Sequence, residues 1–158
     1  MTGHELLKEI QNAIAQDNSV ISWCKEKYGK APSVWIAVDE RAAPAEDDYP
    51  VVGIVALEET SGESKTEKQF TVYLGVGVVQ EEIEENTLAT GSKTKTHKGM
   101  IEAEHLRELV RDAIFRAKIM TVDSEGESAT ESFFPLFVSY QALTFKTLKT
   151  TRRALPAR

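Results

Sequence analysis

Residues 51–80 constrain the fold of this chain more than any other stretch. Two apolar runs, VVGIVALEE and QFTVYLGVGVVQ, flank the polar segment TSGESKTEK, which contains Gly62. Two runs rich in β-branched and aromatic residues, joined by a polar segment with a glycine, are typical of an antiparallel hairpin. Alternation in the second run places five apolar residues on one face of the strand: Phe70, Val72, Leu74, Val76 and Val78. We therefore expect a long hairpin with one core face.

Size and composition predict one globular domain. The chain has 158 residues, 41% hydrophobic and 28% charged, and a chain of that length buries about two thirds of its unfolded surface in a single core. No apolar run approaches the ~20 residues of a membrane-spanning helix, so we expect no membrane association. The first ten residues show no secretory signal. The one cysteine, Cys24, excludes an internal disulfide and is expected to be packed in the core.

The N-terminal residues have the pattern of an amphipathic helix. Thr2 and Glu5 form a capping box, and apolar residues recur at helical spacing over residues 6–14. Residues 18–19, Asn and Ser, offer a break and a new cap, which predicts a short second helix ended by Gly29.

A second, longer amphipathic helix is expected over residues 99–119. Its apolar stripe comprises Leu106, Leu109, Val110, Ala113, Ile114 and Ala117. The opposite stripe is charged and includes Arg107, which we expect to pair with Glu104, while Asp112 is expected to pair with Arg116.

Further strands are expected on both sides of that helix in the sequence. Residues 33–38 predict a short strand, and residues 133–148 predict a long one that alternates between two apolar faces, one of which includes Tyr140. Residues 123–131 contain Gly126 and are expected to form a turn. Residues 1–148 would then be one domain, and residues 149–158 a flexible basic tail.

Residues 81–98, EEIEENTLATGSKTKTHK, carry almost nothing apolar. A stretch of ~18 residues without signals of secondary structure is unusual inside a compact domain, and such stretches are usually binding loops or disordered. We expect this segment to be a functional loop. Its acids lie at one end and its lysines at the other, and the net charge of −6 argues against general nucleic-acid binding.

Motifs for catalysis or cofactor binding are missing from the sequence. Residues 75–80 begin like a dinucleotide-binding fingerprint, but Gln80 stands where glycine or alanine belongs. Neither a phosphate-binding glycine loop nor a nucleophile elbow occurs. The histidines, His4, His97 and His105, lack partners at metal-ligand spacing. We therefore expect no catalytic residues, no cofactor, no metal, and no enzymatic activity.

The expected order of elements is helix, short strand, long hairpin, extended loop, amphipathic helix, long strand and basic tail. This order resembles the tail-terminator, or tail-completion, proteins of long-tailed bacteriophages, phage-tail-like bacteriocins and prophages. The resemblance covers residues 2–147 and lies in MTGHELLKEIQNAI, YPVVGIVALEE, QFTVYLGVGVV, IEAEHLRELVRDAIFRA and LFVSYQALTF. It implies an α+β domain with a mostly antiparallel or mixed sheet built on the long hairpin, flanked by an N-terminal helix and one long amphipathic helix.

The resemblance also implies a structural role. Such proteins form a six-membered ring that caps the tail tube, stops tube polymerisation and joins the tail to the neck or head. The implied partners are other copies of the chain, the tail tube protein, and a neck or head-completion protein. The implied location is the host cytoplasm during assembly and then the top of the tail. A closed ring needs a heterologous interface, in which one surface of each subunit fits a different surface of the next.

Charge and length suggest the interface residues. One acidic group is expected to meet Lys149, Arg152 or Arg153 of a neighbouring copy, and it consists of Glu81, Glu82, Glu84 and Glu85. The tip of the hairpin is expected to reach the tube, and its charged residues are Glu59, Glu63, Lys65, Glu67 and Lys68.

Two other classes of function fit the same sequence. An acidic monomer could block a basic partner with residues 81–85, as an adaptor or immunity-type binding module does. A small enzyme or ligand-binding domain would use a concave pocket between the long helix and the sheet, with His105 or Tyr140 as polar groups. A ring subunit would instead have no such pocket, and it would leave flat apolar or charged surfaces unexplained in one copy.

Overall fold

The computed structural model describes residues 1–38, 41–61 and 67–148. The helices are α1 (Gly3–Ala15), α2 (Asn18–Tyr28), the 3₁₀ turn η1 (Glu46–Asp48) and α3 (Lys98–Ala117). The strands are β1 (Ser33–Ile36), β2 (Val51–Ser61), β3 (Glu67–Val79), β4 (Ile83–Thr87), β5 (Lys93–His97), β6 (Thr121–Phe133) and β7 (Leu136–Leu148). The expected α+β domain with a mixed sheet and flanking helices is confirmed.

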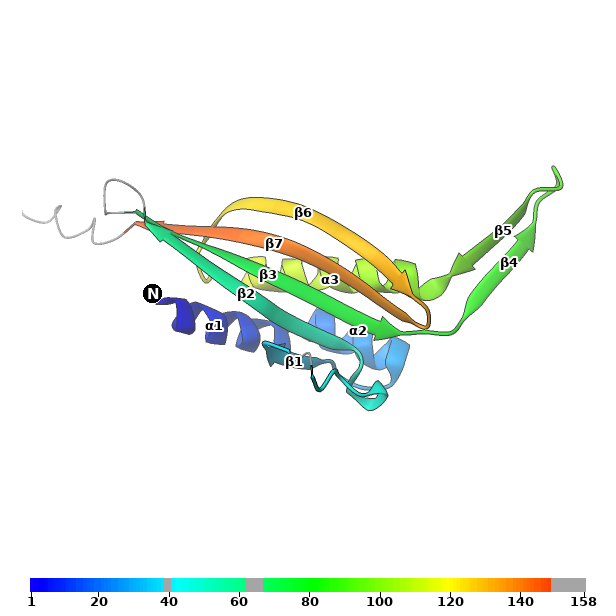
Figure 1. The fold of residues 1–158 in the computed structure, drawn as a ribbon, viewed down its shortest axis with the longest axis horizontal. Helices are drawn as coiled ribbons and strands as arrows, with labels where there is room; N and C mark the ends of the chain where they lie inside the picture. The colour runs from blue at the N-terminus through cyan, green and yellow to red at the C-terminus, as the bar shows by residue number, and fades with distance from the viewer. Residues whose placement is uncertain (39–40, 62–66, 149–158) are drawn as a thin grey trace, which may run out of the picture.

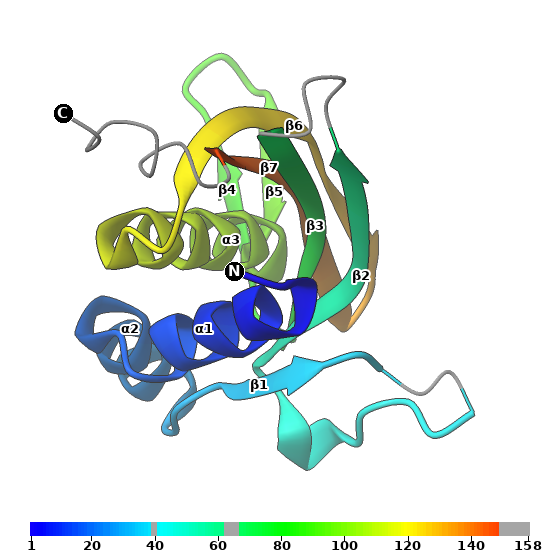
Figure 2. The ribbon, with the colours of Figure 1, turned by 90° about the vertical axis from the view of Figure 1, so that its left-hand side faces the viewer.

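The main sheet has five strands in the order β1-β2-β3-β7-β6. Strand β1 runs parallel to β2, and the other neighbours are antiparallel, which includes the expected hairpin of β2 and β3. The three α-helices lie on one face of this curved sheet, and no helix covers the opposite face in the described part of the chain (Figure 2). We refer to that opposite face as the open face. The helices therefore cover only one face of the main sheet.

The core lies between the helices and the sheet. The five alternating residues of β3 predicted to face the core are all buried, as are Phe137, Leu143 and Phe145 of β7. Helix α1 contributes Leu6, Ile10 and Ile14, and α3 contributes Ala103, Leu106, Val110, Ala113 and Ile114. Cys24 is fully buried, as expected, and its burial raises the pKa of the thiol to about 12.

The helix caps follow the sequence closely, with one correction. The Thr2 hydroxyl accepts a hydrogen bond from the Glu5 backbone N–H at 3.3 Å, and Gly29 ends α2 in the left-handed conformation with φ of 78°. The cap of α2 is Asp17, whose carboxylate accepts from the Val20 N–H at 3.0 Å. The expectation of a cap at residues 18–19 was wrong by one residue, because an aspartate is an equally good cap.

Two segments expected to lack regular structure are strands. Residues 83–97 form the β4–β5 hairpin rather than a loop, and residues 123–131 lie within β6 rather than in a turn. Most residues of these strands face solvent, so they show no apolar alternation. Strand β6 is an edge strand, and its glutamates are typical of edges that must not pair with other sheets.

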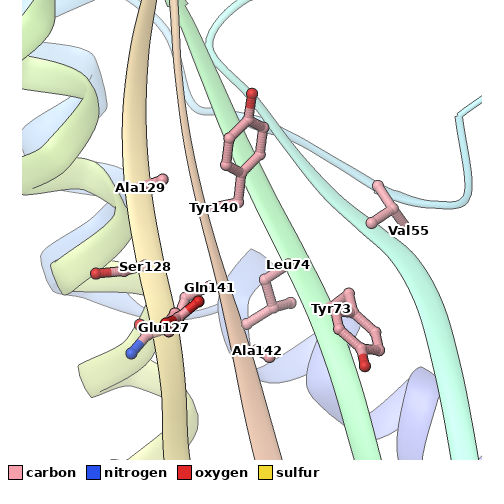
Figure 3. A pocket seen from close by; sticks show the side chains of 9 residues that line it. All are labelled: Val55, Tyr73, Leu74, Glu127, Ser128, Ala129, Tyr140, Gln141 and Ala142. Carbon is pink, nitrogen blue, oxygen red and sulfur yellow. The ribbon is translucent and has the colours of Figure 1, made fainter.

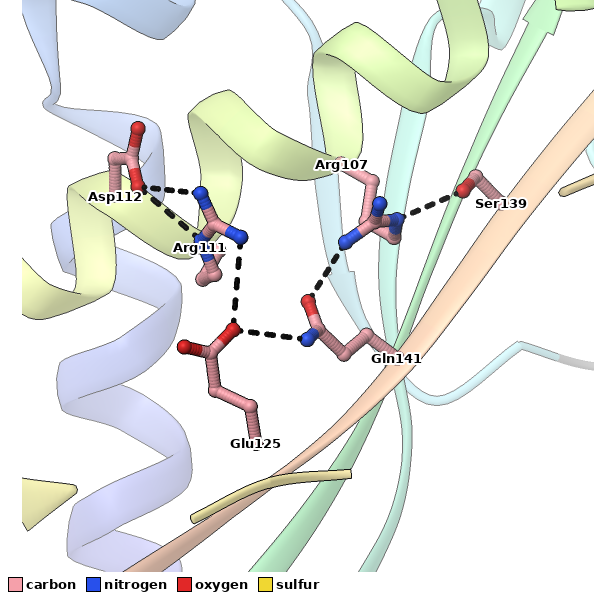
Figure 4. Close-up of polar contacts among 6 residues, drawn as sticks. All are labelled: Arg107, Arg111, Asp112, Glu125, Ser139 and Gln141. Atoms are coloured by element: carbon pink, nitrogen blue, oxygen red, sulfur yellow. Dashed lines mark hydrogen bonds and ion pairs between the residues drawn. The ribbon is translucent and has the colours of Figure 1, made fainter. Parts of the chain in front are cut away.

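Arg107 was wrongly assigned to the solvent-facing stripe of α3. Only 9% of its surface is exposed, and its guanidinium donates to the Ser139 hydroxyl at 3.0 Å and to the Gln141 side-chain oxygen at 2.9 Å (Figure 4). Gln141 in turn donates to Glu125, and Arg111 lies 3.5 Å from the same carboxylate. This network ties α3 to β7 and β6.

The two expected ion pairs within α3 were also wrong. Arg107 binds the sheet instead of Glu104, and the partner of Arg116 is Asp17, which it contacts at 2.8 Å. The neighbour of Asp112 is Arg111, at 3.1 Å. Pairs within a helix are worth a few tenths of a kcal/mol, so contacts with other elements outcompete them. In the part of the chain that the structure describes, no helix is long and apolar enough to span a membrane.

Candidate subunit interface

The β4–β5 hairpin projects as an arm from one end of the main sheet (Figure 1). It has its own two-stranded ladder, in which Ile83 pairs with His97 and Thr87 with Lys93. Every residue of β4 is exposed, and both edges of the ladder are unpaired in the described part of the chain. An isolated two-stranded hairpin is marginally stable in water, so an arm of this kind is typically completed by a partner.

Hydrogen bonds fix the root of the arm to the body. The Gln80 N–H donates to the Pro135 carbonyl at 2.9 Å, and the Lys98 N–H donates to the Glu82 carbonyl at 3.1 Å. The Lys98 ammonium also binds the Glu82 carboxylate at 2.7 Å, and this hydrogen bond raises the pKa of Lys98. The two chain segments that enter and leave the arm are thus held together where they meet the sheet.

Glu102 of α3 connects the root to the helices. Its carboxylate accepts from the Tyr28 hydroxyl at 2.5 Å and from the Gln80 side-chain amide at 3.0 Å. Burial of Tyr28 and its hydrogen bond to Glu102 raise the pKa of the phenol, so it remains a donor at neutral pH. Helix α2, helix α3 and the arm therefore share one polar contact.

Close packing at the start of α3 further restricts the arm. Gly99 is buried, and a Cβ at this position would overlap the ring of Phe137. The His97 ring packs at 5.1 Å from that of Phe134, and its Nδ1 has no hydrogen-bond partner. The arm thus leaves the body in a direction set by backbone bonds on one side and aromatic packing on the other.

Charge is divided along the arm. The four predicted acids, Glu81, Glu82, Glu84 and Glu85, are exposed and run from the root to the middle of β4, where Glu85 stands opposite Lys95. The tip turn is closed by bonds between Leu88 and Ser92 and between Gly91 and Leu88, and Lys93 follows directly, with Lys95 two residues later. Leu88 is 50% exposed. The tip therefore combines an apolar side chain with positive charge, whereas the root is acidic.

The open face of the sheet is the second unusual surface. Tyr73 and Tyr140 stand on it beside Val55, which is 55% exposed, and Ala142 lies on the same strand as Tyr140 and pairs with Tyr73 (Figure 3). Together with residues of β6, these side chains line a groove of about 830 Å³. The Tyr49 ring covers Gly77 on this face, where an added Cβ would lie 3.0 Å from the ring.

Carboxylates surround the groove. Glu127 lines it, and no lysine or arginine is among the described lining residues. The Tyr73 hydroxyl donates to Glu58 at 3.0 Å, and the Tyr140 hydroxyl donates to Glu131. These hydrogen bonds raise the pKa values of both tyrosines. The open face is therefore an apolar strip with an acidic rim.

The predicted residues of the hairpin tip are only partly described. Glu59 and Lys68 form an ion pair at 3.3 Å across β2 and β3, and the Lys68 ammonium lies 5.4 Å above the Phe70 ring. The backbone of Glu67 begins β3. Glu63, Lys65, Lys149, Arg152 and Arg153 lie outside the described residues.

The two predicted charged groups lie at opposite ends of the sheet. The hairpin tip is at the start of β3, and the acidic root of the arm follows its end. Strand β3 has 13 residues, which at ~3.3 Å per residue separates the two ends by roughly 40 Å. The structure therefore does not bring these two groups together within one copy.

The polar groups of the ligand-binding alternative do not converge either. His105 projects from α3 and packs at 5.3 Å from the Trp23 ring of α2, whereas Tyr140 stands on the open face of the sheet. In the described ranges, no three histidine, cysteine, aspartate or glutamate side chains are grouped so that they could hold a metal ion.

No family model matches this chain, and neither does any curated protein sequence.

The two surfaces found by geometry, the tip of the arm and the open face, were not among the predicted interface residues. The signal for the tip was Leu88, an isolated apolar residue in a polar segment. The signal for the open face was the second apolar face of residues 133–148.

Proposed function

We propose that this protein is a structural subunit that assembles with copies of itself into a closed ring, and that the ring caps the tail tube of a phage or phage-tail-like particle. The observation that carries the first part is the arm, a hairpin fixed at its root and exposed along its length. The second part rests on the resemblance to tail-terminator proteins. In this role the ring stops tube polymerisation and joins the tail to the neck or head.

A projecting arm is compatible with a ring. The contact is heterologous when each copy gives its arm to one neighbour and receives an arm from another, whereas two copies that exchange arms with each other form a symmetric pair. Heterologous contacts make rings when the rotation between neighbours closes, and filaments when it does not. The rigid root supports closure, because it fixes the direction in which each arm meets the next copy.

Chain length supports contact between copies for the predicted acidic and basic residues as well. Leu148 pairs with Glu67, at the end of the sheet opposite the arm. Arg153 is five residues further along, and five residues span at most about 18 Å. Because the sheet is roughly 40 Å long, this tail cannot reach the acidic root of its own chain. A contact between these charges therefore requires a neighbouring copy.

The acidic root also fits the adaptor alternative, in which a monomer binds a basic partner. Four exposed carboxylates close together would provide such a surface. In that case the arm would be completed by a foreign protein, and the chain would remain monomeric on its own.

Electron microscopy of the purified protein, alone and with the tail tube protein of the same source, tests the proposal. We expect annular particles with a central opening, and tubes that stop growing when the protein is added. A control chain with a shortened arm should leave tube growth unrestricted. Tubes of unchanged length in the presence of the intact protein would contradict tail-tube capping, and the absence of annular particles under all conditions, including on tubes, would contradict the ring.

A further inference from the structure

We infer that the groove on the open face receives the tip of the arm from a second copy of this chain, with Leu88 seated between Tyr140 and Val55 and the lysines of β5 directed to the acidic rim. The inference rests on the proposed ring and names its interface. It joins two surfaces that nothing within a single copy explains.

The tip and the groove are both apolar, and the groove is large enough to hold more than one side chain. Leu88 is the apolar residue at the tip, and half of its surface is exposed. The groove offers Val55, Tyr73, Tyr140 and Ala142, and its volume of about 830 Å³ exceeds that of one leucine side chain several times over. Docking would bury the exposed half of the Leu88 side chain, and the surrounding turn would cover the two tyrosines. Tyr140 is exposed and Tyr73 partly exposed, and tyrosines in a groove are typical of interface hot spots.

Charge complementarity selects the arm as the occupant. Lys93 and Lys95 are exposed on β5, near the tip. Glu127 lines the groove, and the hydrogen bonds of Tyr73 and Tyr140 hold Glu58 and Glu131 at its border. Three acids of the arm, Glu81, Glu82 and Glu84, lie nearer the root, and Glu85 stands opposite Lys95 in the ladder. Insertion tip first therefore brings Lys93 to the acidic rim before any acid of the arm reaches it.

The receiving groove belongs to another copy. Figure 1 shows the arm directed outward from the end of the sheet, beyond the end of β7 that begins at Leu136. The groove lies on strands β2, β3, β6 and β7 of the main sheet. The hydrogen bonds at the root prevent the arm from folding back onto the groove of its own chain. Each chain thus gives a tip at one end and offers a groove along its sheet, which is the head-to-tail arrangement of a ring.

Disulfide trapping tests this docking directly. Leu88→Cys and Ala129→Cys are made in separate chains, since Ala129 lines the groove and is exposed. The native Cys24 is retained, because it is buried and its thiol has a pKa of about 12. On mild oxidation we expect the mixture to form linked dimers with at least about tenfold higher yield than either variant alone. The matched control replaces Ala129→Cys by Ile101→Cys, an exposed position on α3.

A charge exchange sharpens the test. Lys93→Glu with Lys95→Glu in the chain that gives the tip should lower the trapping yield about tenfold, and Glu127→Lys in the receiving chain should restore much of it. Yields that ignore these charges would overturn the assignment of the acidic rim.

The outcomes separate docking from the ring. A ring by mass without a preferential 88–129 crosslink overturns docking and leaves the proposed function standing. Preferential crosslinks in linked pairs that never close support docking and contradict the ring. If Leu155→Cys traps Ala129→Cys and Leu88→Cys does not, the occupant is the C-terminal segment, and the inference is wrong.

Discussion

The body and the arm follow opposite rules. In the body, strands β2, β3 and β7 place alternate side chains in a core that three helices cover, and even the buried Arg107 has partners on the sheet. In the arm, five residues of β4 are all exposed, and the strands pair only with one another in the described part of the chain. Packing within one copy accounts for the residues of the body apart from those on the open face, and it accounts for almost none in the arm. The arm is therefore the part whose sequence is best explained by contacts outside the chain.

Thiol reactivity should show the largest difference between the two regions. Burial raises the pKa of the Cys24 thiol to about 12, whereas a thiol in Leu88→Cys would titrate near the ordinary value of about 8.5. At pH 8 the thiolate fraction of Cys24 is then about 10⁻⁴, so its reaction with a thiol reagent should be at least about 10³-fold slower. Stopped-flow labelling measures both rates. Fast labelling of native Cys24 would contradict the packed body.

Two glycines provide a comparison at the border between the regions. Gly99→Ala should destabilise the protein by about 3 kcal/mol, because the added Cβ overlaps Phe137 in the core. Gly91→Ala at the tip of the arm has open space but a φ of 92°, so its strain of about 1 kcal/mol should stay within the arm. Urea unfolding followed by tryptophan fluorescence measures the unfolding free energy of the body in both variants. A loss of about 1 kcal/mol from the body in Gly91→Ala would show that the arm and body unfold as one unit.

Arg107 and Arg111 test the polar contact of α3 with the sheet. Arg107→Leu leaves Ser139 and Gln141 without their donor and should cost about 2 kcal/mol in unfolding free energy. Arg111→Leu removes two partly exposed ion pairs, with Asp112 and with Glu125, and should cost less than about 1 kcal/mol. Denaturant midpoints at constant slope measure the difference. An unchanged unfolding free energy in Arg107→Leu would mean that the hydrogen bonds of Arg107 do not stabilise the protein.

Glu102 sets the direction of the arm and should have a smaller effect on stability. Glu102→Leu removes the acceptor shared by Tyr28 and Gln80, for an expected loss of about 1 kcal/mol. Exposed Glu104 on the same helix provides the control, and Glu104→Leu should be near neutral. Amide hydrogen exchange should show faster exchange at residues 80–83 in the first variant only. Unchanged exchange at residues 80–83 would show that Glu102 does not stabilise the root of the arm.

Shortening the arm should have the smallest effect on the body. Replacement of residues 84–96 by Asn-Gly joins Ile83 to His97, which are cross-strand partners, through a two-residue turn. We expect the unfolding free energy to change by less than about 1 kcal/mol, because the removed residues are exposed. Thermal unfolding by circular dichroism measures it. A large loss would mean that the arm stabilises its own body.

Hydrophobic periodicity predicted those helices and strands that have one solvent-exposed face and one buried face. The alternation of β3 and the spacing of α1 and α3 were readable because burial on one side imposes a pattern. The arm and β6 have no such pattern, since neither of their faces is deeply buried. Their strands are held by backbone hydrogen bonds, which do not require any pattern of polar and apolar side chains.

The site was harder to predict than the fold because its parts are distant in sequence. Arg107 was placed in solvent because its partners, Ser139 and Gln141, lie more than 30 positions away. Those two polar residues at inward positions of an apolar strand were the available signal. The groove likewise joins Val55, Tyr73, Tyr140 and Glu127 from four strands, and only the order of strands in the sheet brings them together.

The most direct test of the account is the solution mass of the intact chain and of the chain with the shortened arm, measured by native mass spectrometry over a concentration series. The account predicts a closed species of about 106 kDa for the intact chain, six times 17.6 kDa, and a monomer for the shortened chain. A strict monomer in both cases, or the same ring in both, would contradict the claim that the arm builds the assembly.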